Sequence, residues 1–242
     1  MANILNYHRP ESLDAALALL RRAQPTVILG GGSHLVPSLT DVPTDVVDLQ
    51  ALGLRGICED GHLVALGAMV TFADLAACDQ LPGGVRELAR REAPSTLRTL
   101  ATVGGLVASG DPDSELLASF LVMSATVTVV SADGRQTIPL NTFLAAGVAG
   151  GEIIVCVNVD PSVTVFSART VRTGMDRAIV AIVGARFTDG TMVLAATGSA
   201  NTPVVFSDSA TLTPPSDFRG TESYRLQLAA VLSARVRSEL TT

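Results

Sequence analysis

Hydrophobic residues recur along the chain at two spacings, one typical of helices and one typical of strands. Over residues 13–20 the apolar side chains follow the i, i+3, i+4, i+7 spacing of an amphipathic helix, and the sequence Pro-Glu-Ser at 10–12 supplies its start signal. Apolar runs at 26–29 and 45–49 predict two strands. Together these elements predict a small βαβ-like lobe over residues 1 to about 52, and ligands bind at the carboxyl ends of strands in such sheets.

A second lobe, over residues 53–160, is predicted by further alternating segments. Asp133-Gly134 lies between two β-branched runs, as the turn of a hairpin does. Thr71 and Ser114 stand where helix N-caps are expected, each with an acidic residue in the first turn that follows. The pattern predicts strands at 62–68, 125–131, 136–140 and 152–159, and helices at 71–77, 83–91 and 114–123.

Past residue 160 the chain changes to longer alternating runs, which predict strands at 163–172 and 192–197. The segment between them, 176–187, fits either a strand or a helix. The C-terminal stretch that follows two consecutive prolines has the apolar spacing of an amphipathic helix. The sequence therefore predicts a first domain over 1–160 and a C-terminal domain of a β-sheet with helices over 161–242.

Three glycines interrupt the chain directly after the first predicted strand. The run Thr26-Val27-Ile28-Leu29 continues into Gly30-Gly31-Gly32-Ser33-His34-Leu35. Glycine permits positive φ and lets a ligand approach bare backbone amides, which is how many chains hold phosphates. Both a simple turn and a phosphate-binding loop account for this motif, and His34 within it is either a solvated residue or a ligand contact.

A second glycine pair changes the interpretation of the first. It lies in the sequence ATVGG at 101–105, and the sequence DPDSELL follows at 111–117. Two glycine loops, each beside a hydroxyl residue, could hold the two ends of one diphosphate. Asp111, Asp113 and Glu115 could in principle ligate a metal, but their short spacing and the intervening proline favour an Asp-Pro turn before a helix.

Composition narrows the classes of function. The 242 residues include no lysine, which excludes a P-loop, because that motif needs Gly-Lys-Ser/Thr. A net charge of -6 argues against a nucleic-acid partner. No apolar run approaches the ~20 residues that span a bilayer, and no secretory signal is evident at the N-terminus. Cys58, Cys78 and Cys156 are too dispersed for a zinc or iron–sulfur site, so we expect reduced thiols in a cytoplasmic protein.

The balance of apolar and charged residues bears on partners. Hydrophobic residues make up 48% of the chain and charged residues 17%. One interpretation is that apolar surface is left exposed for a partner. The alternative is a compact monomer, because much of the apolar content is alanine. The sequence contains no nucleophile elbow, paired histidines or metal-ligand spacing. We therefore expect no catalytic residues and no metal site in the chain itself.

Read in order, the two glycine motifs and the DPDSELL segment resemble the FAD-binding subunit of the molybdenum hydroxylases, a family that includes carbon monoxide dehydrogenase medium subunits and the flavin domain of xanthine dehydrogenase. The resemblance implies an α+β fold, with a two-lobed FAD-binding domain of the vanillyl-alcohol-oxidase-like type followed by a small α/β C-terminal domain. The FAD contacts that it implies are Gly31, Gly32, Ser33, His34 and Leu35 in the first motif, Thr102, Gly104 and Gly105 in the second, Ser114 and Glu115 near the ribityl or ribose hydroxyls, and Ile154 on the flavin.

The chain departs from the family pattern at three positions. Leu106 replaces a polar residue that would contact the cofactor, and Glu115 is one methylene longer than the usual Asp. A family lysine near Phe166 has no counterpart, which makes Arg169 the candidate replacement.

The resemblance also implies a role and partners. The chain would be the electron outlet of an FAD-dependent oxidoreductase complex that also contains a molybdopterin-containing large subunit and a 2Fe-2S small subunit, with NAD, oxygen or a quinone as acceptor. A stand-alone flavoenzyme that acts on a small organic molecule and a flavin-free scaffold subunit on the same fold are the alternatives.

Overall fold

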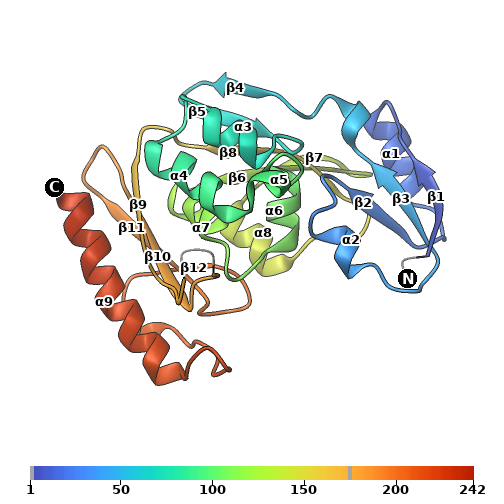
Figure 1. The fold of residues 1–242 in the computed structure, drawn as a ribbon. Coiled ribbons are helices and arrows are strands. Elements are labelled where there is room, and N and C mark those ends of the chain that lie inside the picture. The colour runs from blue at the N-terminus through green and yellow to red at the C-terminus, as the bar shows by residue number, and fades with distance from the viewer. Residues whose placement is uncertain (1–2, 174–175) are drawn as a thin grey trace. The chain divides into compact units, whose positions relative to one another are not determined.

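The computed structural model describes residues 3–173 and 176–242, which pack into two compact units (Figure 1). Unit 1 comprises the described residues up to Asp74 with Ala93–Ser109 and Thr126–Asn158, and unit 2 comprises Leu75–Glu92, Gly110–Ala125 and Val159–Thr242. The chain passes between the units several times, so each unit collects segments that are distant in sequence. The expected domains, 1–160 and 161–242, stay a prediction.

The N-terminal part of unit 1 is a parallel sheet in the strand order β1-β3-β2. Its strands are β1 (Ile4–His8), β2 (Thr26–Leu29) and β3 (Thr44–Asp48). Helix α1 (Leu13–Leu20) begins after Ser12, whose hydroxyl accepts the N–H of Ala15. The expected βαβ arrangement is confirmed, and β1 is an additional edge strand that the apolar pattern did not predict.

A five-stranded sheet forms the rest of the framework of unit 1, in the order β4-β5-β8-β6-β7. The four strands expected here are present, and β4 joins them as an unexpected edge. The hairpin between β6 and β7 turns at Ala132-Asp133, one residue before the expected Asp133-Gly134, because Gly134 pairs with Ser131 as the first residue of β7. The strands are β4 (Ile57–Asp60), β5 (Leu63–Gly67), β6 (Thr126–Ser131), β7 (Gly134–Pro139) and β8 (Ile153–Val159).

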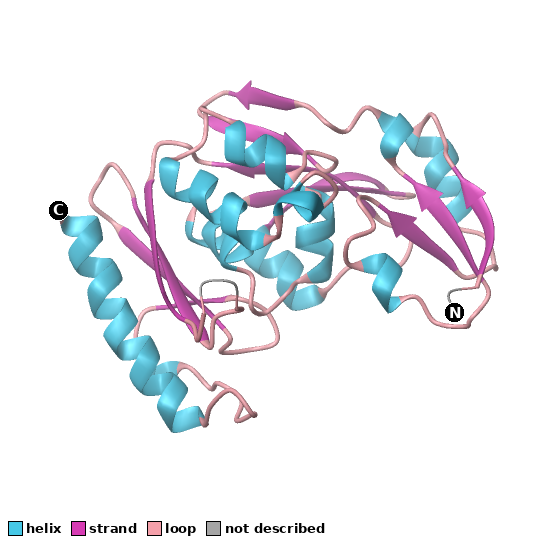
Figure 2. Cartoon of the chain, in the orientation of Figure 1, coloured by secondary structure: helices cyan, strands magenta, loops and turns pink. Residues whose placement is uncertain are grey.

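Short helices connect these strands (Figure 2). At the predicted cap Thr71, the Asp74 carboxylate accepts the N–H of Thr71 while the Thr71 hydroxyl accepts the N–H of Asp74, which fixes the start of α3. Helix α8 and the short helices other than α3 were not expected from the sequence. They are α2 (Leu35–Ser38), the 3-10 helix Gln50–Leu52, α3 (Phe72–Ala77), α5 (Ser95–Arg98), α6 (Val103–Ser109) and α8 (Leu140–Ala146).

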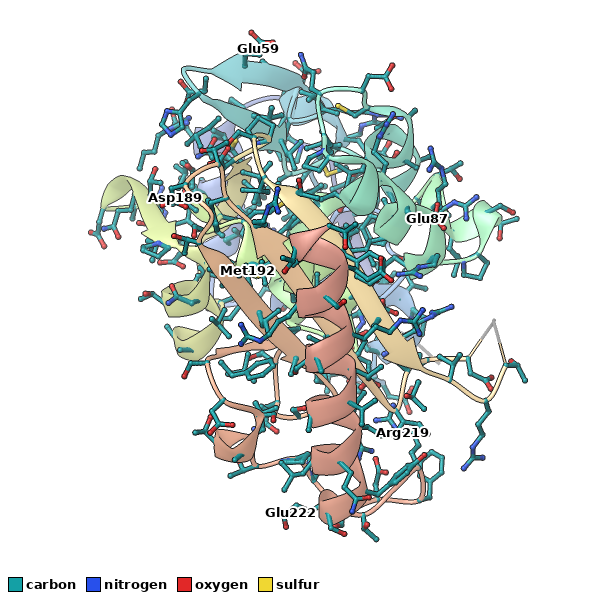
Figure 3. All side chains as sticks on the ribbon, turned by 90° about the vertical axis from the view of Figure 1, so that its left-hand side faces the viewer. Glu59, Glu87, Asp189, Met192, Arg219 and Glu222 are labelled. Atoms are coloured by element: carbon teal, nitrogen blue, oxygen red, sulfur yellow. The ribbon has the colours of Figure 1, made fainter. Side chains whose placement is uncertain are left out.

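Unit 2 is built on an antiparallel sheet in the order β12-β11-β10-β9. Helix α9 lies along one face of this sheet (Figure 3), and α7 packs on the other (Figure 1). The ambiguous segment 176–187 contributes the strand β10. The elements are α4 (Gly83–Glu92), α7 (Glu115–Val122), β9 (Thr164–Thr170), β10 (Val180–Arg186), β11 (Met192–Thr197), β12 (Val204–Phe206), the 3-10 helix Ser209–Thr211 and α9 (Glu222–Thr241).

Each unit has its own hydrophobic core. In unit 1, apolar residues of α1 and β3 pack with Ile153 and Val155 of β8. In unit 2, Ile182 and Leu194 of the sheet pack with Leu232 and Val236 of α9. Burying side chains of this size stabilises a fold by about 1.5–3 kcal/mol each. Within the described residues, no helix has the length and hydropathy that crossing a bilayer requires.

Candidate functional site

The first glycine motif forms a loop between β2 and α2 in unit 1. In the part of the chain that the structure describes, the backbone N–H groups of residues 31–35 donate no hydrogen bond to another group. Gly32 has a φ of +73°, which favours glycine and turns the chain so that consecutive amides come near one another. Buried or half-buried amides nearly always find an acceptor, so this row of free donors is a place for an anionic ligand.

The second glycine motif is the first turn of a helix, rather than a loop as expected. Val103 and Gly104 donate their N–H groups to the carbonyls of Val70 and Ala68, at 2.9 and 2.8 Å, and an added Cβ at Gly104 would come within 2.8 Å of the Ala68 Cβ. Gly104 therefore has a packing role in unit 1. Gly105 is exposed, and its N–H donates to the hydroxyl of Thr102 at 3.2 Å.

The two motifs touch each other within unit 1. An added Cβ at Gly30 would lie 2.9 Å from the Thr102 Oγ1, and one at Gly31 would lie 1.5 Å from the carbonyl oxygen of Leu100. Only glycine allows this approach. The sequence separates the motifs by about 70 residues, yet the fold brings residues 30–35 and 100–105 together.

This arrangement fits the diphosphate of a dinucleotide. A diphosphate presents several anionic oxygens, and the loop offers five consecutive amide donors beside the hydroxyl of Thr102. Ser33 is half-buried and His34 is exposed within the same loop. Among the described residues, the Ser33 hydroxyl makes no hydrogen bond. The donor set of unit 1 is therefore suited to FAD.

The expected site residue Ile154 and the departure Leu106 are both buried in unit 1. Ile154 is 7% exposed and lies on β8 between Ile153 and Val155, which belong to the core of unit 1. Leu106 is 6% exposed within α6. Leu106 thus packs as a core residue where the family has a polar one.

Ser114 and Glu115 belong to unit 2, together with Arg169. The Ser114 hydroxyl caps α7 by accepting the N–H of Leu117 at 2.9 Å, as expected. The Glu115 carboxylate forms ion pairs with Arg91 at 3.0 Å and with Arg169 at 3.4 Å. In this structure Arg169 is therefore a partner of Glu115, and both acid and hydroxyl are buried.

The other two acids of the DPDSELL segment also pair with arginines in unit 2. Asp111 contacts Arg177 at 2.7 Å, and Asp113 contacts Arg219 at 2.8 Å. Within the described residues, no group of His, Cys, Asp or Glu is arranged to hold a metal ion. The acids thus tie the loop before α7 to the rest of the unit.

The arginine network continues to the start of α9. Arg225 is fully buried and donates to the carbonyls of Ile179 and Gly198, at 3.0 and 2.7 Å, and to Asp217 at 2.6 Å. Its hydrogen bond holds the pKa of Asp217 down at about 2. Arg225, in the first turn of α9, therefore also connects this helix to the sheet of unit 2.

Sequence reasoning missed Glu92, the last residue of α4. Its Oε2 accepts the N–H of Leu116 at 3.1 Å, and burial raises its pKa to about 7. The only sequence signal was an acid at the C-terminal end of a predicted helix, where the helix dipole disfavours negative charge.

Comparison with known proteins identifies the family. A family model described as the FAD binding domain in molybdopterin dehydrogenase matches residues 3–160, well over half of the chain. The chain belongs to this family. Since the family is one of FAD-binding domains in oxidoreductases, the expected cofactor and enzyme class are confirmed.

Relatives and solved structures extend the similarity beyond residue 160. The carbon monoxide dehydrogenase medium chain of Afipia carboxidovorans is 27% identical, over an alignment that covers 95% of this chain and 94% of the relative. The glyceraldehyde dehydrogenase medium chain of Sulfolobus acidocaldarius is 24% identical over 97% of this chain and 98% of its own length.

The reconstituted CO dehydrogenase from Oligotropha carboxidovorans superimposes with a TM-score of 0.89 at 25% identity, over 99% of this chain and 98% of that one. The expected α+β fold class is thereby confirmed, and the chain is a medium, FAD-binding subunit of the molybdenum hydroxylase family.

Proposed function

We propose that this chain binds FAD and, within a molybdenum hydroxylase complex, transfers electrons from the complex to an external acceptor. A 2Fe-2S small subunit would deliver the electrons that a molybdopterin-containing large subunit takes from the substrate, and an external acceptor would receive them from this chain. When bound, FAD supplies the redox chemistry, since it can exchange electrons with both clusters and soluble acceptors. The protein supplies binding, orientation and electrostatics.

The observation that carries the proposal is the row of free amides at residues 31–35. These donors have no partner among the described residues, and the second glycine motif lies directly beside them. The amides would hold the diphosphate, and Thr102 and Gly105 would line its binding site next to α6. Ile154 would offer apolar contact to the flavin ring. These roles leave the chain without a group that activates an organic substrate.

The partners are proposed from the relatives. Those with the widest coverage are named as medium chains, and others as the alpha or medium subunit of an enzyme complex, each of which requires other subunits. We also propose a cytoplasmic location, supported by three cysteines, Cys58, Cys78 and Cys156, that are all free thiols.

An absorption spectrum of the purified full chain, after incubation with FAD and removal of free nucleotide, tests the cofactor role. We expect the bands of a bound flavin at close to one FAD per chain. A chain that retains no flavin would favour the flavin-free scaffold.

Affinity purification from cells that express the whole complex then tests the partners, and we expect a molybdenum-containing and an iron–sulfur subunit to copurify. A flavin-loaded chain that purifies alone would favour the stand-alone flavoenzyme.

A further inference from the structure

Three exposed apolar residues border the loop of free amides in unit 1. Val36 is 54% exposed in α2, Leu97 is 40% exposed in α5, and Leu100 is 51% exposed two residues after α5 ends. Single exposed apolar side chains are common on protein surfaces, but a group of them beside one polar loop is typical of a binding site. We refer to these three residues as the apolar patch.

Backbone geometry connects the apolar patch to the loop. A Cβ added at Gly31 would lie 1.5 Å from the carbonyl oxygen of Leu100, and one added at Gly32 would lie 3.2 Å from Val36 Cγ2. The carbonyl of Leu97 accepts the N–H of Leu100 at 3.0 Å, so the two leucines stand three residues apart on one helical turn. The patch therefore adjoins the first two residues of the row of free amides.

The combination of amides and aliphatic side chains indicates what kind of ligand fits here. Ligand sites are mostly lined by apolar side chains, with a few polar groups that fix the orientation of the ligand. The amides of residues 31–35 suit a diphosphate, and the apolar patch suits the face of a planar ring, because covering it removes apolar surface from water. Together they suit a ligand whose ring lies close to its phosphates.

FAD carries two ring systems, one on each side of its diphosphate. The adenine is joined to the diphosphate through a cyclic ribose, whereas the flavin is joined through an open ribityl chain that reaches farther. Because the apolar patch directly adjoins the amides, the adenine fits it better. We propose that the apolar patch binds the adenine of FAD, an inference that rests on the proposed role in binding FAD.

Leu100→Gln tests this inference, because glutamine is similar in length to leucine but polar. We expect about a fivefold rise in the dissociation constants of FAD and of ADP for the full chain, since less apolar surface is buried on binding. ADP carries the adenine and the diphosphate without the flavin. Leu5→Gln is the matched control, because Leu5 is 50% exposed in β1 of the same unit and lies outside the patch. It should bind both ligands as the wild type does, and both variants should keep the wild-type melting temperature.

Methyl NMR of the unmodified chain provides a measurement that is independent of any variant. An adenine stacked on the patch shifts the signals of nearby methyl groups through its ring current. Addition of ADP should therefore shift the methyl signals of Leu97 and Leu100, and inorganic pyrophosphate, which has no ring, should shift them much less. Equal shifts with both ligands would contradict the proposal.

The outcomes separate the apolar patch from the proposed function. Equal FAD affinity in the wild type and in Leu100→Gln would overturn the inference and leave the FAD role intact. Weaker binding of FAD without weaker binding of ADP, or a wild type that binds FAD but not ADP, would overturn the assignment to the adenine. A wild type that binds no FAD would overturn the proposed function as well.

Discussion

At the scale of single residues, the glycines of the two motifs differ in what they do. Gly31 and Gly104 allow close contact within unit 1, since an added Cβ would meet the Leu100 carbonyl oxygen at 1.5 Å and the Ala68 Cβ at 2.8 Å. Position 32 requires glycine, because its φ of +73° is one that other residues rarely adopt. Gly105 alone among them is exposed and helical without positive φ, and the nearest atom to an added Cβ is Thr102 Oγ1 at 3.1 Å. Gly105 is therefore the position at which binding can be separated from folding.

Gly105→Ala should weaken FAD binding and leave the fold intact. Alanine is favoured over glycine in a helix by about 1 kcal/mol, which offsets the tight contact with Thr102, while the new methyl group would obstruct a ligand that approaches the backbone. We expect at least about a tenfold rise in the FAD dissociation constant with an unchanged melting temperature. Gly83→Ala is the control, because an added Cβ at this α4 residue has no neighbour within 4 Å. Equal FAD affinity in both variants would mean that the diphosphate does not approach α6.

At the scale of elements, local patterns predicted most of the fold. Strand β2 and helices α1, α3, α7 and α9 begin and end within a few residues of their expected limits, because apolar spacing and caps such as Ser12 and Ser114 are local signals. Strand β1 was missed because all five of its residues are half-buried or exposed at a sheet edge and carry no alternation. Helix α6 was missed because its two glycines disfavour a helix, and backbone bonds to Val70 and Ala68 hold it instead.

The candidate site shows the same limit of local information. The glycine motifs could be recognised from their sequence, but only the fold brings residue 31 against residue 100. Glu92 was missed because its partner Leu116 is 24 residues away. Likewise, Leu106 lies in a motif that suggested a cofactor contact, while packing makes it a core residue. Interactions between distant segments therefore account for what the sequence pattern could not predict.

The packing of α9 on β10 depends on Gly184. An added Cβ there would lie 2.6 Å from Val236 Cγ1 and 2.8 Å from Leu240 Cδ1, so Gly184→Val should overpack this contact and cost about 1–3 kcal/mol in the free energy of unfolding. Urea denaturation measures the cost, and adding Val236→Ala should recover part of it because the two side chains share one space. Gly150→Val, at a position with no neighbour within 4 Å of an added Cβ, is the control. Similar losses in the two glycine variants would show that the backbone and not the contact with α9 is responsible.

At the scale of the whole molecule, the chain combines a dinucleotide-binding framework with an arginine-rich ion-pair network and no lysine. Arginine remains charged at all accessible pH values, so the pairs with Asp113 and Glu115 persist wherever those acids are ionised. Among the carboxyl groups that the structure describes, Glu92 differs from these ion-paired acids because its pKa is raised to about 7. A change of pH near neutrality therefore acts on the start of α7 more than on the ion pairs around it.

The isolated chain should accept electrons but oxidise no organic substrate. Within the described residues no group of His, Cys, Asp or Glu is arranged to hold a metal ion, and Asp113 and Glu115 are paired with arginines. We therefore expect the chain alone not to activate a carbon–hydrogen bond. Loaded with FAD, the purified chain should be bleached by an artificial reductant and reoxidised by an acceptor, both visible in its absorption spectrum. Reduction by an organic substrate should occur only after the iron–sulfur and molybdenum subunits are added back, and the chain loaded with FAD but lacking them is the control. Sustained turnover of such a substrate by the chain alone would establish it as a stand-alone flavoenzyme.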